Sequence, residues 1–162
     1  MSHITITPYR PEHAARFAEL NRDWLEGYGL MEPPDEAQLR DPEGHFLTPG
    51  GQILVALDGD ALIGTCAIAP HRPGELELAK LAVVEGYRGQ GIARRLVQGC
   101  LDHARALGAR RVTLMSNGRL QAAVRLYASL GFVHRPLPPD APYQSADVYM
   151  VLELDVPTPA RA

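Results

Sequence analysis

The stretch ELAKLAVVEGYRGQGIARRL, residues 77–96, contains an apolar strand, a tight glycine loop and the start of an amphipathic helix, in that order. The loop, residues 88–93, has small residues at the alternate positions Gly89, Gly91 and Ala93. Small residues let backbone N–H groups approach a bulky anion, and the helix that follows points its positive end at the same place. The stretch therefore predicts a pyrophosphate site where a strand passes into a helix.

The rest of the chain alternates short apolar strands with helical stripes. Its 162 residues predict one domain, which we place at residues 1–156 with a flexible tail at 157–162. The expected strands are residues 4–6, 53–57, 61–69, 76–84, 111–115, 132–133 and 147–154, and the expected helices are 11–25, 35–40, 90–107 and 120–130. On the third helix Ile92, Leu96, Cys100 and Ala104 recur four apart, which is typical of a buried face. Strands interspersed with helices indicate a mixed sheet, in the α/β (α+β) class, with helices on its faces.

Composition narrows the function classes. Hydrophobic residues make up 46% of the chain, charged residues 22%, and the net charge is −3, so a nucleic-acid partner, which would favour a basic face, is not expected. No apolar run approaches the ~20 residues of a membrane span, and the N-terminus lacks the pattern of a signal peptide. The two cysteines are too few for a disulfide framework, and we expect a reduced, cytoplasmic location. The six histidines show no metal-ligand spacing, so no metal is expected.

The glycine loop has three other possible interpretations. A Walker loop ends in Gly-Lys-Ser/Thr, whereas this loop continues Gly91-Ile92-Ala93. A dinucleotide-binding loop usually follows the first strand and has an acidic ribose partner after it, and residues 111–115 contain none. A tight strand-to-helix turn without a ligand stays possible on the loop alone.

The pattern Arg88-x-x-Gly91-x-Ala93 after a strand that ends in Ala82-Val83 resembles the coenzyme A pyrophosphate loop of the GNAT superfamily of N-acetyltransferases. The downstream Asn117, Ala123, Leu126-Tyr127 and Leu130-Gly131-Phe132, and the closing segment 146–150, resemble the same superfamily, so the likeness covers nearly the whole chain. It implies a central, mostly antiparallel sheet of about seven strands flanked by about four helices. It also implies acetyl transfer from acetyl-CoA to an amine.

The resemblance and the loop together predict the residues that bind the cofactor. Backbone N–H groups of Gly89, Gln90, Gly91, Ile92 and Ala93 would bind the pyrophosphate, and Arg88 and Arg94 would add positive charge, unless they simply face solvent. Asn117 would contact the cofactor, or else cap the following helix. The resemblance further implies that the strand before the loop splays from its neighbour to admit the pantetheine arm. Backbone N–H groups of Leu81, Ala82 and Val83 would then stabilise the oxyanion.

Glu77 is the predicted general base. It matches a glutamate that some members of the superfamily use in this role, and a carboxylate in the middle of a sheet would have its pKa raised by desolvation. The alternative interpretation leaves both Glu75 and Glu77 exposed on a sheet edge, with a water chain or a substrate that arrives deprotonated in place of the base. Strict alternation would also place Lys80 among leucines, so we expect a bulge between Ala79 and Leu81 that turns Lys80 outward.

Tyr127 is the predicted general acid. It matches the superfamily tyrosine that protonates the departing sulfur, and an ordinary tyrosine keeps its proton at neutral pH; plain core packing is the alternative. Cys66 and Cys100 are unconvincing nucleophiles, since Cys100 lies on the apolar helical stripe.

The acceptor pocket is expected near residues 28–45 and 136–143. Its candidate walls are Trp24, Tyr28, Phe46 and Tyr143, and two isolated histidines, His71 and His134, fall close by. The acidic residues Glu26, Glu32, Asp35 and Glu36 would favour a cationic amine, although such clusters are more often solvated.

The sequence thus predicts an N-acetyltransferase that acts on a primary amine of a small molecule or peptide, without nucleic-acid or membrane partners and compatible with a homodimer. Two alternatives stay open: a non-catalytic acyl-CoA sensor, and a transferase for a larger acyl group.

Overall fold

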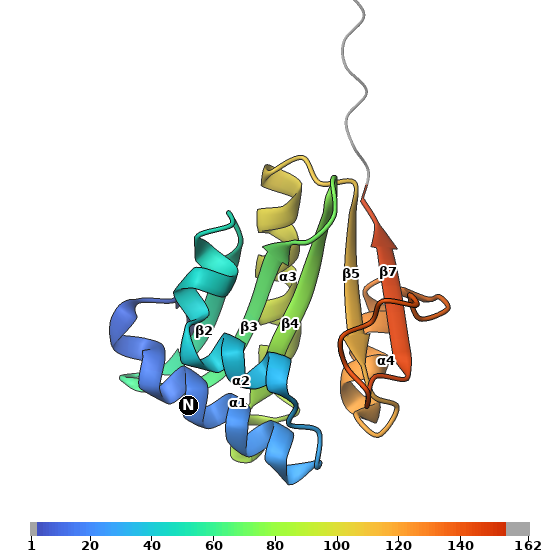
Figure 1. The fold of residues 1–162 in the computed structure, drawn as a ribbon. Coiled ribbons are helices and arrows are strands. Elements are labelled where there is room, and N and C mark those ends of the chain that lie inside the picture. Colours follow the sequence, from blue (N-terminus) through green and yellow to red (C-terminus); the bar gives the residue numbers. More distant parts are fainter. Residues whose placement is uncertain (1–2, 155–162) are drawn as a thin grey trace, which may run out of the picture.

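The computed structural model describes residues 3–154, which form one seven-stranded sheet with helices on both faces (Figure 1). The strands are β1 (Ile4–Pro8), β2 (Gln52–Asp58), β3 (Ala61–Pro70), β4 (Glu75–Val83), β5 (Arg111–Ser116), β6 (Val133–His134) and β7 (Val148–Glu153). The α-helices are α1 (Ala14–Gly27), α2 (Pro33–Arg40), α3 (Ile92–Ala106) and α4 (Gln121–Ser129), and shorter helices are η1 (Pro11–His13), η2 (Glu43–Leu47) and η3 (Glu85–Tyr87). The tail predicted at 157–162 lies outside the described residues.

The sheet has the strand order β1-β2-β3-β4-β5-β7-β6. Every neighbouring pair is antiparallel except β4 and β5, which are parallel. That pair is joined only from Glu75–Arg111 to Leu78–Leu114, although both strands continue beyond it. The two strands diverge at their C-terminal ends (Figure 1), so the splay that the resemblance implies is confirmed and leaves one side of β4 without a strand partner.

Helices α3 and α4 cover one face of the sheet. The predicted stripe of α3 is buried, with Ile92 2% exposed and Leu96, Cys100 and Ala104 fully buried. Burying each large apolar side chain contributes roughly 1.5–3 kcal/mol, so this stripe anchors α3 against β2, β3 and β4.

Helices α1, α2 and η2 cover the opposite face. Phe17 and Leu20 of α1, Leu39 of α2 and Phe46 of η2 form its core with β2 and β3. The π-helix η2 was not predicted, because five residues are too few to show a helical period. Phe46, expected as a wall of the acceptor pocket, packs into this core instead and is 3% exposed.

A β-bulge interrupts β4 where it diverges from β5. Thr65 of β3 pairs with Ala82 and Ala67 with Ala79, so Cys66 alone faces both Lys80 and Leu81. The extra residue shifts the alternation: Leu76, Leu78, Leu81 and Val83 belong to the α3 side, whereas Ala79 and Ala82 belong to the α1 side. Lys80 has φ +57°, the only described non-glycine residue with positive φ. The predicted bulge is confirmed, and it takes Lys80 out of the leucine-rich core.

Candidate active site

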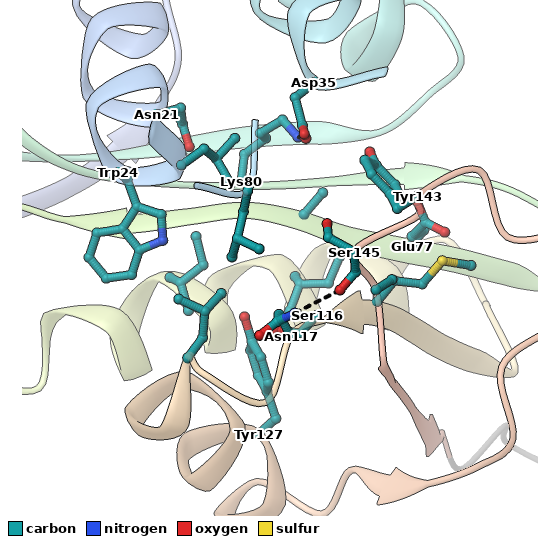
Figure 2. Close-up of a pocket in the computed structure, with 18 residues that line it drawn as sticks. Asn21, Trp24, Asp35, Glu77, Lys80, Ser116, Asn117, Tyr127, Tyr143 and Ser145 are labelled. Atoms are coloured by element: carbon teal, nitrogen blue, oxygen red, sulfur yellow. Dashed lines mark hydrogen bonds and ion pairs between the residues drawn. The ribbon is translucent and has the colours of Figure 1, made fainter. Parts of the chain in front are cut away.

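A pocket opens where β4 and β5 diverge (Figure 2). Residues from α1, the α1–α2 loop, α2, β4, β5, α4 and the segment before β7 line it. They are Asn21, Trp24, Leu25, Leu30, Asp35, Glu77, Leu78, Ala79, Lys80, Leu81, Met115, Ser116, Asn117, Leu120, Tyr127, Tyr143, Ser145 and Ala146. The pocket therefore joins the open side of β4 to the region expected to bind the acceptor.

Glu77 enters this pocket from β4, in the middle of the sheet rather than at its edge. Burial raises the pKa of its carboxyl group above the ordinary 4.5, and the positive charges of His71, Lys80 and Arg72 oppose that rise. The predicted desolvation of Glu77 is confirmed, and its carboxylate is a suitable proton acceptor near neutral pH. Glu75 instead pairs with Arg111 at 3.0 Å, outside the pocket.

Tyr127 enters the pocket from α4, and its ring packs edge-to-face on Phe132 with centroids 5.8 Å apart. The residue is 7% exposed, so both the packing and the chemical interpretation find support in its position. Burial, with a smaller contribution from Cys66, raises the pKa of its hydroxyl well above the ordinary 10. The hydroxyl is thus protonated throughout the neutral range and available as a donor.

The ammonium group of Lys80 lies 2.5 Å from Oδ1 of Asp35 on α2, and both side chains are 5% exposed (Figure 2). The expectation that Lys80 turns outward is therefore wrong, because the bulge directs it into the pocket, where Asp35 compensates for its burial. Asp35 was expected to belong to a solvated acidic cluster, but in this pair its side chain is buried. Desolvation lowers the pKa of Lys80, whereas Asp35 and Glu77 act to raise it.

The glycine loop has the geometry of an anion site. Gly89 and Gly91 have φ of +79° and +78°, and an added Cβ at either would meet no atom within 4 Å. Among residues 3–154, the N–H groups of Gly89, Gln90 and Gly91 have no hydrogen-bond acceptor. The N–H groups in the first turn of α3, which begins at Ile92, have no carbonyl acceptor within the helix, as in any α-helix. The loop thus presents a set of free donors beside open space.

The arginines of the loop make other contacts. Arg88 lies over the ring of Trp24, 4.7 Å from its centroid, and Arg94 donates to Oγ of Ser129 on α4 at 2.7 Å. Each guanidinium group thus has a protein contact, whereas the N–H groups of Gly89, Gln90 and Gly91 have none among residues 3–154. The part of Arg88 and Arg94 in cofactor binding stays a prediction.

The remaining predicted cofactor residues occupy different environments. Leu81 lines the pocket, whereas the side chains of Ala82, Val83 and Ile92 are buried. Ala93 packs against the core on the α3 side, which contains Val83 and Ile92. Asn117 lines the pocket, but its amide donates to the Ser145 carbonyl at 2.7 Å and its Oδ1 accepts from the Arg119 N–H at 2.9 Å. It does not cap α4, whose N-cap residue is Leu120.

Glu32 ties the α1–α2 loop to the segment before β7. Its carboxylate accepts hydrogen bonds from the Gln144 N–H at 2.7 Å, the Ser145 N–H at 3.1 Å and the Ser145 hydroxyl. Burial raises the pKa of Glu32, but these three donors outweigh it and lower the net value below 4.5. Next to this clamp, burial and the charges of Asp35 and Glu77 raise the pKa of Tyr143 well above 10.

Several sequence candidates lie outside the pocket. His71 and His134 are exposed and do not line it, and Tyr28 packs on Trp24 at 5.6 Å. Cys66 and Cys100 are free and fully buried, and burial raises the pKa of the Cys66 thiol. Residues 3–154 contain no cluster of histidine, cysteine and carboxylate side chains able to bind a metal ion. In the same range no helix is long and apolar enough to cross a membrane.

Comparisons with known proteins agree with this geometry. The model of the Acetyltransferase (GNAT) family matches residues 14–132. N-alpha-acetyltransferase 30 of Schizosaccharomyces pombe is 43% identical over 134 residues, which cover 80% of this chain and 83% of that protein. N-acetyltransferase family 8 member 2 of Rattus norvegicus is 33% identical over 102 residues, 60% of this chain and 45% of that protein.

Solved structures share the fold. An acetyltransferase of the GNAT family from Staphylococcus aureus superposes with a TM-score of 0.87 at 19% identity, covering 94% of this chain and all of the other. A phosphinothricin acetyltransferase from Sinorhizobium meliloti, solved in complex with acetyl-CoA, has a TM-score of 0.78 at 21% identity, covering 99% of this chain and 95% of the other.

The pocket between the splayed strands β4 and β5, and the glycine loop that follows β4, fit a coenzyme A thioester, which agrees with the match to the acetyltransferase family. The chain belongs to the GNAT family of acetyltransferases. It is an acetyl-CoA-dependent N-acetyltransferase.

Proposed function

We propose that this enzyme transfers the acetyl group of acetyl-CoA to a primary amine of a small molecule or a peptide. One observation carries the proposal: Glu77 from β4 and Tyr127 from α4 enter the same pocket at the β4–β5 opening. A desolvated carboxylate and a protonated phenol are the base and the acid that aminolysis of a thioester requires.

Two parts of the cofactor, the pyrophosphate and the pantetheine arm, have candidate partners among the described residues. Free N–H groups of Gly89, Gln90 and Gly91, with the N-terminus of α3 and Ala93, would bind the pyrophosphate. Beyond Leu78, the side of β4 that faces β5 has no strand partner, so its backbone can bind an extended pantetheine arm as another strand would. Acetyl-CoA supplies an activated acyl group on a thiolate leaving group.

Each side chain then has one task. Glu77 accepts a proton from the acceptor amine, directly or through water, so that the nitrogen lone pair can form the new C–N bond. The backbone N–H groups of Leu81 and Val83 stabilise the negative charge on the acyl oxygen, whereas the N–H of Ala82 faces β3, as that of Val84 does. Tyr127 donates its proton to the sulfur as the C–S bond breaks. Glu77 and Tyr127 thus end with one proton gained and one proton lost, and solvent restores both.

The acceptor would enter beside Tyr143 and Glu77, with Trp24 and Leu30 as further walls of the same pocket. The name of the Schizosaccharomyces pombe relative, an N-alpha-acetyltransferase, favours the α-amine of a peptide over other amines. Small amines stay within the proposal because the same pocket would admit them.

The test is acetyl transfer to a panel of amines with peptides bearing a free or blocked α-amine, lysine side chains and small primary amines. Thiol release reports turnover, and mass spectrometry locates the acetyl group. We expect acetylation of at least one primary amine and none of the blocked peptide. Thiol release no faster with any amine than with water would contradict the proposal.

A further inference from the structure

Two residues that are unfavourable for their local structure, Lys80 and Asn21, meet the buried hydroxyl of Thr65 at the bulge in β4. Lys80 has φ +57°, a conformation that side-chain-bearing residues rarely adopt. Asn21 lies buried within α1, although asparagine is a weak helix former, and Thr65 is a fully buried hydroxyl in β3. Unfavourable local choices that converge on one point are typical of functional sites.

These residues form a directed hydrogen-bond relay. The side-chain amide of Asn21 donates to the Phe17 carbonyl at 2.9 Å, which only a nitrogen can do, and also donates to Oγ1 of Thr65 at 3.0 Å. Thr65 therefore accepts from Asn21, and its single hydroxyl hydrogen is left for the Lys80 carbonyl, 2.7 Å away. Thr65 is 0% and Asn21 1% exposed, so water does not compete for these groups.

The relay fixes the orientation of one peptide group. The Lys80 carbonyl and the Leu81 N–H belong to the same planar peptide, and no peptide bond among the described residues is cis. In a trans peptide the carbonyl and the N–H point in opposite directions. Because Thr65 draws the carbonyl toward β3, the Leu81 N–H points away from β3, toward the side on which β5 has diverged. The ion pair with Asp35 restrains Lys80 at its other end.

We propose that Asn21 and Thr65 are positioning residues for acetyl transfer, and that they act by aiming the Leu81 N–H at the acyl oxygen of the bound thioester. This inference rests on the proposed role of the β4 backbone in stabilising that oxygen. The ordinary alternative is that the relay only satisfies a buried carbonyl, in which case its loss would lower stability and leave the chemistry of folded molecules unchanged.

The test is a graded series at one position: Thr65→Ser, Thr65→Cys and Thr65→Val. Serine keeps the hydroxyl donor, cysteine keeps a weak donor of similar size, and valine keeps the shape without a donor. Ile53→Val is the matched control, because Ile53 is fully buried on the same face of the sheet but lies on β2, which does not pair with β4. All variants are compared as kcat per folded molecule.

We expect kcat to fall in the order of donor strength, with Thr65→Ser within about threefold of the wild type and Thr65→Val roughly 10- to 100-fold lower, as misplacement of a reacting group implies. Ile53→Val should keep the wild-type kcat. If Thr65→Val does not fold, Thr65→Cys still has to fall below Thr65→Ser. Equal kcat across the series, or a loss in Ile53→Val equal to that in Thr65→Val, would overturn the inference.

A second measurement needs no acceptor and separates this inference from the proposed function. Calorimetry gives the Kd of acetyl-CoA and of coenzyme A, which lacks the acyl oxygen. We expect Thr65→Val to raise the Kd of acetyl-CoA by about three- to tenfold relative to the Kd of coenzyme A, which corresponds to one hydrogen bond. If Thr65→Val does not fold, the same result is expected of Thr65→Cys. An unchanged ratio overturns the positioning role even if amines are acetylated, whereas a changed ratio supports it even if the amine panel fails.

Discussion

Lys80 and Asp35 form an ion pair that is almost completely removed from water inside the acceptor side of the pocket, with Nζ and Oδ1 2.5 Å apart. The pair joins α2 to the bulge in β4, two elements that lie 45 residues apart in the chain. It therefore fixes the wall of the pocket from which Glu77 also projects.

Breaking this pair on one side should be far more damaging than replacing both partners. Lys80→Met leaves a buried carboxylate unpaired and should lower the free energy of unfolding by about 3–5 kcal/mol. The double variant Lys80→Met/Asp35→Asn removes both charges and should recover most of that loss. Urea unfolding of the single and double variants measures the coupling; additive losses would show that the pair does not act as a unit.

Glu77→Gln should abolish most of the activity and stabilise the protein at neutral pH. Because burial raises the folded-state pKa of Glu77 above 4.5, its contribution to stability is present below the unfolded pKa and is lost as pH rises through the folded pKa. We expect the variant to melt at a higher temperature than the wild type at about pH 8 and at the same temperature near pH 4.

The pH profile of the wild type checks the same carboxylate. As a general base, Glu77 should make kcat/KM fall as pH drops through its raised pKa, and Glu77→Gln should lose this limb together with roughly 10²–10⁴-fold in rate. A retained limb in the variant would transfer the role of base to another group.

Tyr127→Phe should lower kcat about 100-fold and leave acetyl-CoA binding unchanged, because it removes only the proton donor. The Tyr127 ring packs on Phe132, a contact that phenylalanine keeps, and no described residue hydrogen-bonds the hydroxyl, so the variant should also keep its melting temperature. Tyr9→Phe is the matched control: Tyr9 has the same 7% exposure, and its hydroxyl contacts Glu43 outside the pocket. Steady-state kinetics with unchanged kcat in Tyr127→Phe would remove this residue from the mechanism.

Gly91→Ala should weaken acetyl-CoA by about tenfold or more, equivalent to ~1.4 kcal/mol, because its methyl group enters the space next to the free N–H groups. Gly108→Ala is the control at the other end of α3, with φ +74° and equally open surroundings. Both substitutions introduce the same left-handed strain of roughly 1–2 kcal/mol. Calorimetric Kd values that change equally in the two variants would assign the effect to strain alone.

Glu32→Gln should raise the acceptor KM by about threefold or more and leave the Kd of acetyl-CoA unchanged, because an amide accepts fewer of the hydrogen bonds that bind residues 144–145. Since those bonds depress the pKa of Glu32, the clamp persists at neutral pH and is lost only as pH falls through that lowered value. Glu36→Gln is the control, since Glu36 lies four residues after Glu32, in α2, but pairs with Arg22. An equal KM in the two variants would argue against the clamp.

Local sequence patterns predicted most of the strands and helices and part of the candidate site. Residues close together in the sequence were enough to predict three features. These are the buried face of α3, the loop around Gly89 and Gly91, and the desolvation of Glu77 in its strand. The misfit of Lys80 in its strand also predicted the bulge, because a lysine cannot replace a leucine in a core. Its final direction was wrong, since that direction depends on Asp35, which no local pattern connects to it.

The contacts that complete the pocket are long-range. Asn21 reaches Thr65 over 44 residues, and Glu32 reaches Ser145 over 113 residues. Asn21 and Thr65 did carry a detectable signal, a polar side chain within an otherwise apolar helical or strand face, but such a position alone does not name its partner.

The parallel β4–β5 contact described above is short: four residue pairs connect the four N-terminal strands of the sheet to the three C-terminal ones. A thioester donor bound in the opening would contact both parts of the sheet at once and hold them together for as long as it stays bound. At 100 times its Kd, such a ligand adds about 2.7 kcal/mol to the stability of the folded chain. The supply of activated acetate would then govern the lifetime of the enzyme as well as its rate.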